Sequence, residues 1–245
     1  PIRQLCSTEV PLPIALNRTD DEYIIPANTV VAHQILALAK ATDKQTLRKA
    51  FEVFALALAP HVNRRTILHR TPEARLAGRL FDFDKVVKPY LGEDSEAFYV
   101  SVQDQWAWNS RYWEQRALLA KGTSIEAAIT FARHAVAIED HPFPLTTLGK
   151  MLLAQMEAVP SKRDESFKEA IEHLDRAIEK EHSNSRVKVH PYSTLLSGAL
   201  SFLALGGRLS DAQKKGFRGI IAEAQFQFFF DTSLQETCHR LSKQV

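Results

Sequence analysis

The chain has 245 residues, of which 45% are hydrophobic and 24% are charged, a balance typical of a folded globular protein. Its 31 basic and 29 acidic residues leave a formal net charge of +2, which argues against a dedicated nucleic-acid-binding protein. No apolar run approaches the roughly 20 residues of a membrane-spanning helix, so we expect no membrane partner.

The N-terminal part is expected to be an irregular segment, 1–26, followed by a helical bundle, 27–92. Three prolines interrupt any helical period in the first segment. From residue 27 the apolar spacing predicts two amphipathic helices, separated by Thr42-Asp43, with Asp43 as an N-cap and Pro60 ending the second. Thr71-Pro72-Glu73 then predicts the start of a short helix to about Phe81.

The remainder, 93–245, is expected to hold helical repeats and a C-terminal capping helix. A long helical segment covers 94–121 and bends near Asn109-Ser110. Thr123-Ser124-Ile125-Glu126 matches a capping box and opens a helix to about Glu139, where His141-Pro142 starts the next. Further helices are predicted over 164–181, 191–205, 210–224 and 233–243. No run alternates as a strand would, so the sequence predicts an all-α fold.

Three of these helices superpose at an offset of 42 residues. Small residues recur at the helix start and again seven positions later; the two columns are Ala128, Ala170, Ala212 and Ala135, Ala177, Gly219. In the preceding helices a larger residue stands one turn before a small one, as in Trp113/Ala117, Leu145/Gly149 and Thr194/Gly198. Recurring Ala or Gly predicts positions where two helices approach closely, and the period predicts a helical repeat.

The segment from Trp113 to Glu223, less than half of the chain, resembles tetratricopeptide (TPR) repeats, although its spacing is longer and its third unit is degenerate. The resemblance implies antiparallel helix pairs stacked as a short α-solenoid, with the N-terminal bundle packed on it. It also implies that a polypeptide binds to the inner face. Because that face usually comes from the first helix of each pair, the expected binding residues are Asn109, Arg116, Thr146, Lys150 and Ser197.

A narrower resemblance covers Trp108 to Leu118 and continues into Leu145 to Gly149. This part is similar to the C-terminal helical region of bacterial STAND-type NTPases, the NLR-like proteins often found in antiphage defence. The resemblance implies a sensor domain whose ligand could be a phage protein and whose NTPase and effector lie upstream. The chain has no Gly-x4-Gly-Lys-Ser/Thr phosphate loop, so this chain itself is not expected to be an enzyme or to need a cofactor.

Two alternatives stay open. Arg64 and His69 have the Arg-x4-His spacing of HEPN ribonucleases, in which His would act as acid or base and Arg would stabilise phosphate charge. Arg176 and His182 show a similar spacing. Two such pairs are about the number that chance predicts for a chain of this composition. The other alternative is a constitutive scaffold or adaptor with no sensing role, and a homo-oligomer is compatible with each reading.

Other clusters have simpler interpretations. Asp82 and Asp84 are expected to cap a helix rather than bind a metal. Trp108 and Tyr112 share a helix face and are either exposed as a binding surface or, the slightly favoured alternative, covered by the N-terminal helices. The phenylalanines at 226, 228, 229 and 230 are expected to lock the C-terminal helix onto the last repeat.

The cysteines favour a reducing, cytoplasmic setting. Only Cys6 and Cys238 occur, at opposite ends of the chain, and a secreted disulfide scaffold would hold many more. The N-terminus lacks the apolar core of a signal peptide. Because the first residue is Pro1, either an initiator methionine has been removed or the chain is a piece of a longer polypeptide.

Overall fold

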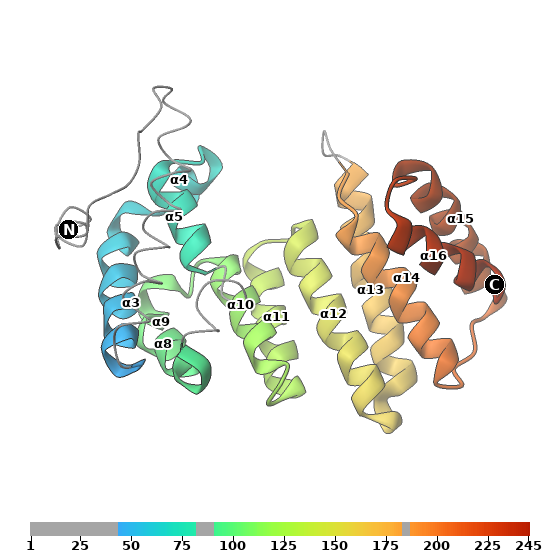
Figure 1. Ribbon diagram of the computed structural model, residues 1–245, viewed down its shortest axis with the longest axis horizontal. Coiled ribbons are helices and arrows are strands. Elements are labelled where there is room, and N and C mark those ends of the chain that lie inside the picture. The colour runs from blue at the N-terminus through green and yellow to red at the C-terminus, as the bar shows by residue number, and fades with distance from the viewer. Residues whose placement is uncertain (1–43, 82–90, 183–186) are drawn as a thin grey trace. The chain divides into compact units, whose positions relative to one another are not determined.

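The computed structural model describes residues 44–81, 91–182 and 187–245. Within these ranges the regular elements are all helices, with no strand among them, which confirms the predicted all-α fold (Figure 1). The chain divides into two compact units, Pro1–Gln115 and Arg116–Val245. The division therefore falls inside helix α10 (Ser110–Ala120) and not at residue 92, where the sequence suggested a boundary.

The first unit has an aromatic core. Trp106, Tyr99 and Tyr112 are fully buried, and the Phe81 ring lies edge-to-face with Trp106 at 4.8 Å between centroids. The Trp106 indole N–H donates to the carbonyl of Ala55 at 3.2 Å, and this bond ties α9 to α3. Besides α10, the described helices of this unit are α3 (Lys44–Leu58), α4 (Arg64–Leu68), α5 (Pro72–Leu80), α8 (Ser95–Ser101) and α9 (Gln103–Trp106).

The second unit is built from longer helices with an aliphatic core. Helix α12 packs against α11, α13 and α14, and α16 packs against α14 and α15. The core is formed by buried residues of all these helices, among them Met151, Leu174 and Leu196. The helices are α11 (Ile125–Ile138), α12 (Pro142–Ala158), α13 (Arg163–His182), α14 (His190–Ala204), α15 (Asp211–Gln227) and α16 (Thr232–Ser242).

Local signals placed most helix starts correctly. The Thr71 hydroxyl accepts the backbone N–H of Ala74 at 3.3 Å at the start of α5, and His141 precedes Pro142 at the start of α12. The capping box at the start of α11 is wrong in its detail. Ser124 is the N-cap and its hydroxyl accepts the N–H of Ala127, so the Glu126 carboxylate takes no part in capping.

The single long helix expected over 94–121 is three helices. Helix α8 ends at Ser101, α9 covers four residues, and α10 begins at Ser110. The predicted bend near Asn109-Ser110 is therefore a break, and the Asn109 side chain accepts the N–H of Arg111 at 2.9 Å there. The predicted helix before residue 42 lies outside the described residues.

Two of the predicted close approaches are confirmed. A Cβ on Gly149 would lie 2.5 Å from the Leu174 Cγ, and a Cβ on Gly198 would lie 2.5 Å from a Leu153 methyl. Gly149 thus lets α12 approach α13, and Gly198 lets α14 approach α12. The alanines of the first two copies are fully buried, as expected: Ala128, Ala135, Ala170 and Ala177.

The prediction of small, buried residues at the third copy of this pattern, in α15, is wrong. Ala212 and Gly219 are exposed on α15, and a Cβ on Gly219 would meet nothing within 4 Å. The buried positions of α15 are Phe217, Ile221 and Ala224. These have the same mutual spacing as the buried Ala170, Leu174 and Ala177 of α13. The third copy is therefore displaced by more than 42 residues.

The phenylalanine run behaves differently from the prediction. Phe228 is buried and packs on Tyr192, with 5.2 Å between ring centroids. Phe226, Phe229 and Phe230 are exposed instead. Only one of the four rings therefore holds the C-terminal helices in place.

Two further observations concern the length and character of the helices and the burial of Cys238. Among the described helices, none has the length and apolar character to cross a bilayer. Cys238 is buried in α16, where burial raises the pKa of its thiol.

Candidate functional site

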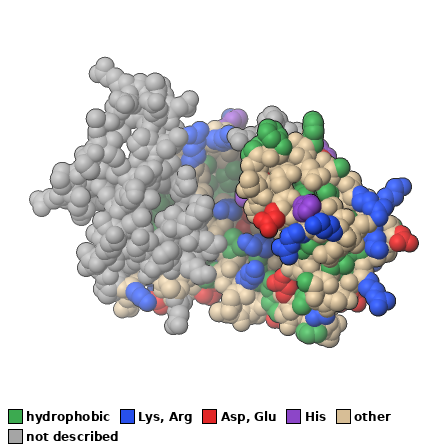
Figure 2. Space-filling model, turned by 45° about the vertical axis from the view of Figure 1, so that its right-hand side comes forward, with side chains coloured by type: hydrophobic (Ala, Val, Ile, Leu, Met, Phe, Trp, Pro, Cys, Tyr) green, Lys and Arg blue, Asp and Glu red, His purple; other side chains and the backbone are tan. Residues whose placement is uncertain are grey.

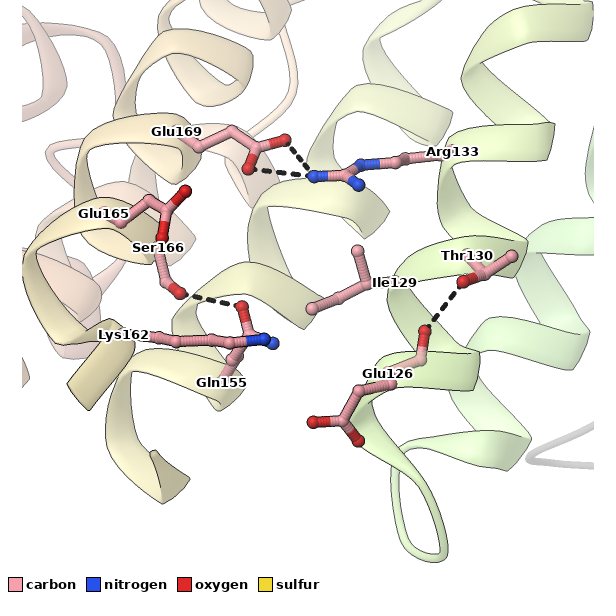
Figure 3. Close-up of a pocket in the computed structure, with 9 residues that line it drawn as sticks. All are labelled: Glu126, Ile129, Thr130, Arg133, Gln155, Lys162, Glu165, Ser166 and Glu169. Atoms are coloured by element: carbon pink, nitrogen blue, oxygen red, sulfur yellow. Dashed lines mark hydrogen bonds and ion pairs between the residues drawn. The ribbon is translucent and has the colours of Figure 1, made fainter. Parts of the chain in front are cut away.

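A polar pocket of about 290 Å³ opens between α11 and α13 (Figure 3). Helix α12 contributes one lining residue, and the short 3-10 helix Pro160–Lys162 contributes another. The lining side chains are those of Glu126, Ile129, Thr130, Arg133, Gln155, Lys162, Glu165, Ser166 and Glu169. All of them belong to the second unit.

One end of the pocket is closed by an ion pair between α11 and α13. A single guanidinium nitrogen of Arg133 donates to both carboxylate oxygens of Glu169, at 2.7 and 3.0 Å. His173, one turn further along α13, has its Nε2 3.6 Å from the same carboxylate. Burial lowers the pKa of His173, and the Glu169 charge opposes that shift.

The floor of the pocket is a buried hydrogen bond between α12 and α13. The Ser166 hydroxyl donates to the side-chain oxygen of Gln155 at 2.8 Å, and both residues are buried. The hydroxyl proton is thus given to an uncharged amide oxygen, which is not a general base and does not activate Ser166 as a nucleophile. The floor therefore holds the two helices together and presents polar atoms to the pocket.

Three charged side chains that line the pocket have no ion pair with another described residue. Glu126, Glu165 and Lys162 are all exposed, and no ion pair joins any of them to another described residue. Since Arg133 and Glu169 neutralise each other, two carboxylates face one ammonium group. The arrangement therefore favours a ligand that brings a positive charge.

The predicted binding residues of the first unit are largely enclosed. Tyr112 is fully buried, and its hydroxyl donates to the carbonyl of Tyr99 at 2.6 Å. Asn109 is buried as the cap of α10. Trp108 is partly exposed, stacks on Trp106 and donates its indole N–H to Gln105 at 2.9 Å. The alternative in which the N-terminal helices cover this face therefore holds for Tyr112.

The four predicted binding residues of the second unit differ in exposure. Arg116 is buried, with its guanidinium 4.2 Å from the centre of the Phe131 ring. The Thr146 hydroxyl donates to the Pro142 carbonyl at 2.6 Å within α12. Lys150 on α12 and Ser197 on α14 are exposed. Burial removes Arg116 from direct ligand contact, whereas Lys150 and Ser197 are available to a ligand.

The residues of the ribonuclease alternative lie at the two ends of α4. Arg64 is its first residue and His69 its C-cap, and both side chains are exposed. The chain reverses directly after His69, because Arg70 has a φ of +51° and Thr71 donates to the Thr66 carbonyl at 3.0 Å. Among the described residues, no hydrogen bond or ion pair holds the Arg64 or the His69 side chain in place, so the geometry adds no support to ribonuclease chemistry.

A second polar cluster joins α13, α14 and α15. The Tyr192 hydroxyl donates to Glu223 at 2.7 Å, and His182 contacts both of these side chains. Burial, followed by the hydrogen bond to Glu223, raises the pKa of Tyr192. The cluster holds the end of α13 against α15, and its groups are committed to one another.

The metal prediction is not addressed by the described residues. Asp82 and Asp84 lie outside them. Across 44–81, 91–182 and 187–245, no group of three or more His, Cys, Asp or Glu side chains is placed to hold a metal ion.

The pocket was missed at the sequence level because its acids have another explanation. Glu126 and Glu165 stand in the first turns of α11 and α13, where acidic residues are common because they interact with the helix dipole. No spacing in the sequence pairs them, because the offset of 42 residues aligns Glu126 with Lys168 and not with Glu165. Comparisons with protein families, curated proteins and solved structures found no match.

Proposed function

We propose that this chain is a polypeptide-binding domain made of TPR-like helix pairs, and that the pocket accepts a Lys or Arg side chain of the bound polypeptide. The observation that carries the proposal is that two exposed carboxylates, Glu126 and Glu165, line the pocket without an ion-pair partner among the described residues. A guanidinium or ammonium group would neutralise them.

The volume of the pocket supports a single side chain as the ligand group. Small-molecule sites usually occupy roughly 300–1,000 Å³ and are mainly apolar. This pocket, at about 290 Å³, lies at the lower limit, and Ile129 is its one hydrophobic lining residue. One long cationic side chain fits that volume and polarity better than a cofactor does.

The helix packing supports the repeat architecture. The first helix of a TPR-like pair contacts its own second helix and the first helix of the next pair. Helix α12 has these neighbours in α13 and α14, with Gly149 and Gly198 at the closest approaches. The pocket lies between α11 and α13, the second helices of their pairs, and therefore on different helices from Lys150 and Ser197.

Selection from a random-peptide display library tests the proposal. We expect the wild-type chain to enrich peptides that contain Lys or Arg, and the Glu126→Gln/Glu165→Gln variant to lose that enrichment. Glu157→Gln removes an equally exposed carboxylate from α12 outside the pocket and should behave as the wild type. Enrichment that is absent, or that the double variant keeps, contradicts the proposal.

The sensor role in a STAND-type defence protein is the narrower form of this proposal, and its support is the sequence resemblance at Trp108 to Leu118. Affinity capture with this chain from phage-infected and uninfected cells tests it. A protein captured only from infected cells, and lost in the Glu126→Gln/Glu165→Gln variant, is the expected result. The same partner from both samples would identify a constitutive scaffold instead.

A further inference from the structure

Three phenylalanines at the end of α15 stand in solvent. Phe226, Phe229 and Phe230, here called the phenylalanine patch, are 84%, 76% and 72% exposed. Phe229 and Phe230 contact each other edge-to-face at 5.6 Å. Figure 2 shows hydrophobic side chains standing out at the top of the described surface, with Lys and Arg side chains spread over the same face. Exposed apolar clusters of this kind mark interaction surfaces.

The patch continues into an exposed face of α15. Helical periodicity places Lys215, Gly219, Ala222 and Phe226 on one side of the helix, here called the α15 strip, and all four are exposed. Glycine weakens an exposed helix relative to alanine. Because a Cβ on Gly219 would meet nothing within 4 Å, packing inside the chain does not require it. A face this shallow suits the close approach of another backbone.

Charge is distributed unevenly along this face. Lys215 and Arg218 are exposed at the end opposite the phenylalanines, and Arg218 donates to the Val245 carbonyl. The sequence from 212 to 222 contains no acidic residue. The face therefore runs from basic, through small, to aromatic side chains.

We propose that two copies of this chain associate through the α15 strip, antiparallel about a two-fold axis that passes between Gly219 and Ala222. The order of side chains makes the surface complementary to itself. Small residues meet at the centre, and Phe226 of each copy lies over Lys215 of the other, where a cation next to an aromatic ring is attractive.

Electrostatics and area are both compatible with this pairing. With a rise of 1.5 Å per residue, the two Lys215 side chains would start about 16 Å apart, beyond the Debye length of roughly 8 Å. The six phenylalanines of two patches would bury on the order of 1,000 Å², which is close to the lower limit for a specific interface. A lipid bilayer would also bind the phenylalanine rings and the basic side chains. The small residues at the centre of the strip, however, do not contribute to binding a bilayer, whereas they allow a second helix to approach closely.

Sedimentation equilibrium of the full chain over a concentration series tests the proposal. We expect a monomer–dimer equilibrium that Gly219→Leu weakens at least tenfold, because the new side chain fills the space that the second helix needs. Leucine is a good helix former, and its Cβ would meet nothing within 4 Å on this exposed face, so this variant should fold. Glu236→Gln, an exposed change on α16, should leave the equilibrium unchanged.

Two results would contradict the proposed dimer. A wild-type chain that stays monomeric at every concentration overturns the proposal. This holds even if the chain sediments with phosphatidylserine vesicles or binds acidic peptides. A dimer that keeps its affinity both in Gly219→Leu and in the triple variant Phe226→Ser/Phe229→Ser/Phe230→Ser overturns it too. Neither result bears on the pocket between α11 and α13, which is tested with peptides.

Cross-linking tests the antiparallel register. Ala222 lies close to the proposed axis, so Ala222→Cys should form a disulfide-linked dimer under mild oxidation. Glu236→Cys provides the control, since it introduces an exposed thiol on α16 away from the strip. Equal cross-linking of both variants would contradict this register.

Discussion

At the scale of single residues, Asp175 is the clearest case of a charge held in an unfavourable place. One of its carboxylate oxygens is buried without a hydrogen bond to any described residue. Burial, followed by repulsion from Glu179 one turn away, raises the pKa of Asp175 to about 6. The folded protein therefore keeps the proton on this carboxyl group to a higher pH than the unfolded chain does.

This pKa predicts a pH-dependent effect of Asp175→Asn. Between the unfolded pKa of about 3.9 and the folded value of about 6, the folded state holds a proton that the unfolded state has lost, so Asp175 lowers stability as pH rises. At pH 7 the substitution should raise the Tm by about 2–4 °C, after allowance for partial exposure. Below pH ~4 the gain should disappear.

Thermal unfolding of both proteins from pH 4 to pH 7 measures the effect. Glu157→Gln, an exposed change on α12, provides the control for removal of a surface carboxylate. An Asp175→Asn gain that is the same at both ends of this range would show that lost repulsion and desolvation are not its cause.

At the scale of elements, the sequence predicted helices well wherever a chemical signal marks an end. Pro142 and Pro72 cannot extend a preceding helix, and the hydroxyls of Ser124 and Thr71 accept first-turn N–H groups, so these starts were predictable. The break at Val102 carries no such signal. The Val102 N–H donates to the Val100 carbonyl, and the Val102 carbonyl accepts the N–H of Gln105. Because the apolar spacing continues through this break, the periodicity gives no sign of it.

The predicted third copy of the small-residue pattern shows why periodicity alone was insufficient. Matching small residues at a fixed offset selected Ala212 and Gly219, whereas burial selects Phe217 and Ala224. The connections over 183–189 and 205–210 are longer than the corresponding ones over 139–141 and 159–162. In addition, the large Phe217 side chain occupies in α15 the position that the small Ala170 occupies in α13. The pocket was harder still to predict, since its residues come from three separate segments, in α11, in α12, and in α13 with the 3-10 helix that precedes it.

Gly149 and Gly219 lie in different surroundings, so we expect a change from glycine to alanine to have opposite effects on stability at the two positions. Gly149→Ala should destabilise the chain by about 1–2 kcal/mol, because the new methyl group would lie 2.5 Å from the branch carbon of Leu174. Gly219→Ala should stabilise the monomer by up to about 1 kcal/mol, because alanine favours the helix and meets no neighbour.

Chemical denaturation at low protein concentration, where self-association does not contribute, measures both changes. Each variant serves as the control for the other, since the chemical change is identical and only the packing differs. A gain in stability for Gly149→Ala would show that α12 and α13 separate easily, and that the small residue is not needed for their approach.

At the scale of the whole molecule, the division into two units inside α10 determines where the chain can be cut. Among the described residues, the buried core of the second unit draws on residues from Ala117 to Leu241 and on none before Ala117. A cut at the unit boundary would nevertheless remove the first turns of α10, together with the Asn109 side chain that caps it. A fragment that starts at Asn109 keeps both.

We therefore expect the fragment 109–245 to be helical and to unfold cooperatively, whereas a fragment 116–245 should be less stable because α10 lacks its cap and half its length. Circular dichroism during heating compares the two. Gly149→Ala, placed in the longer fragment, should lower its Tm as it does in the full chain. If that fragment instead lacks a cooperative transition, the second unit depends on residues before Asn109, and its aliphatic core is insufficient on its own.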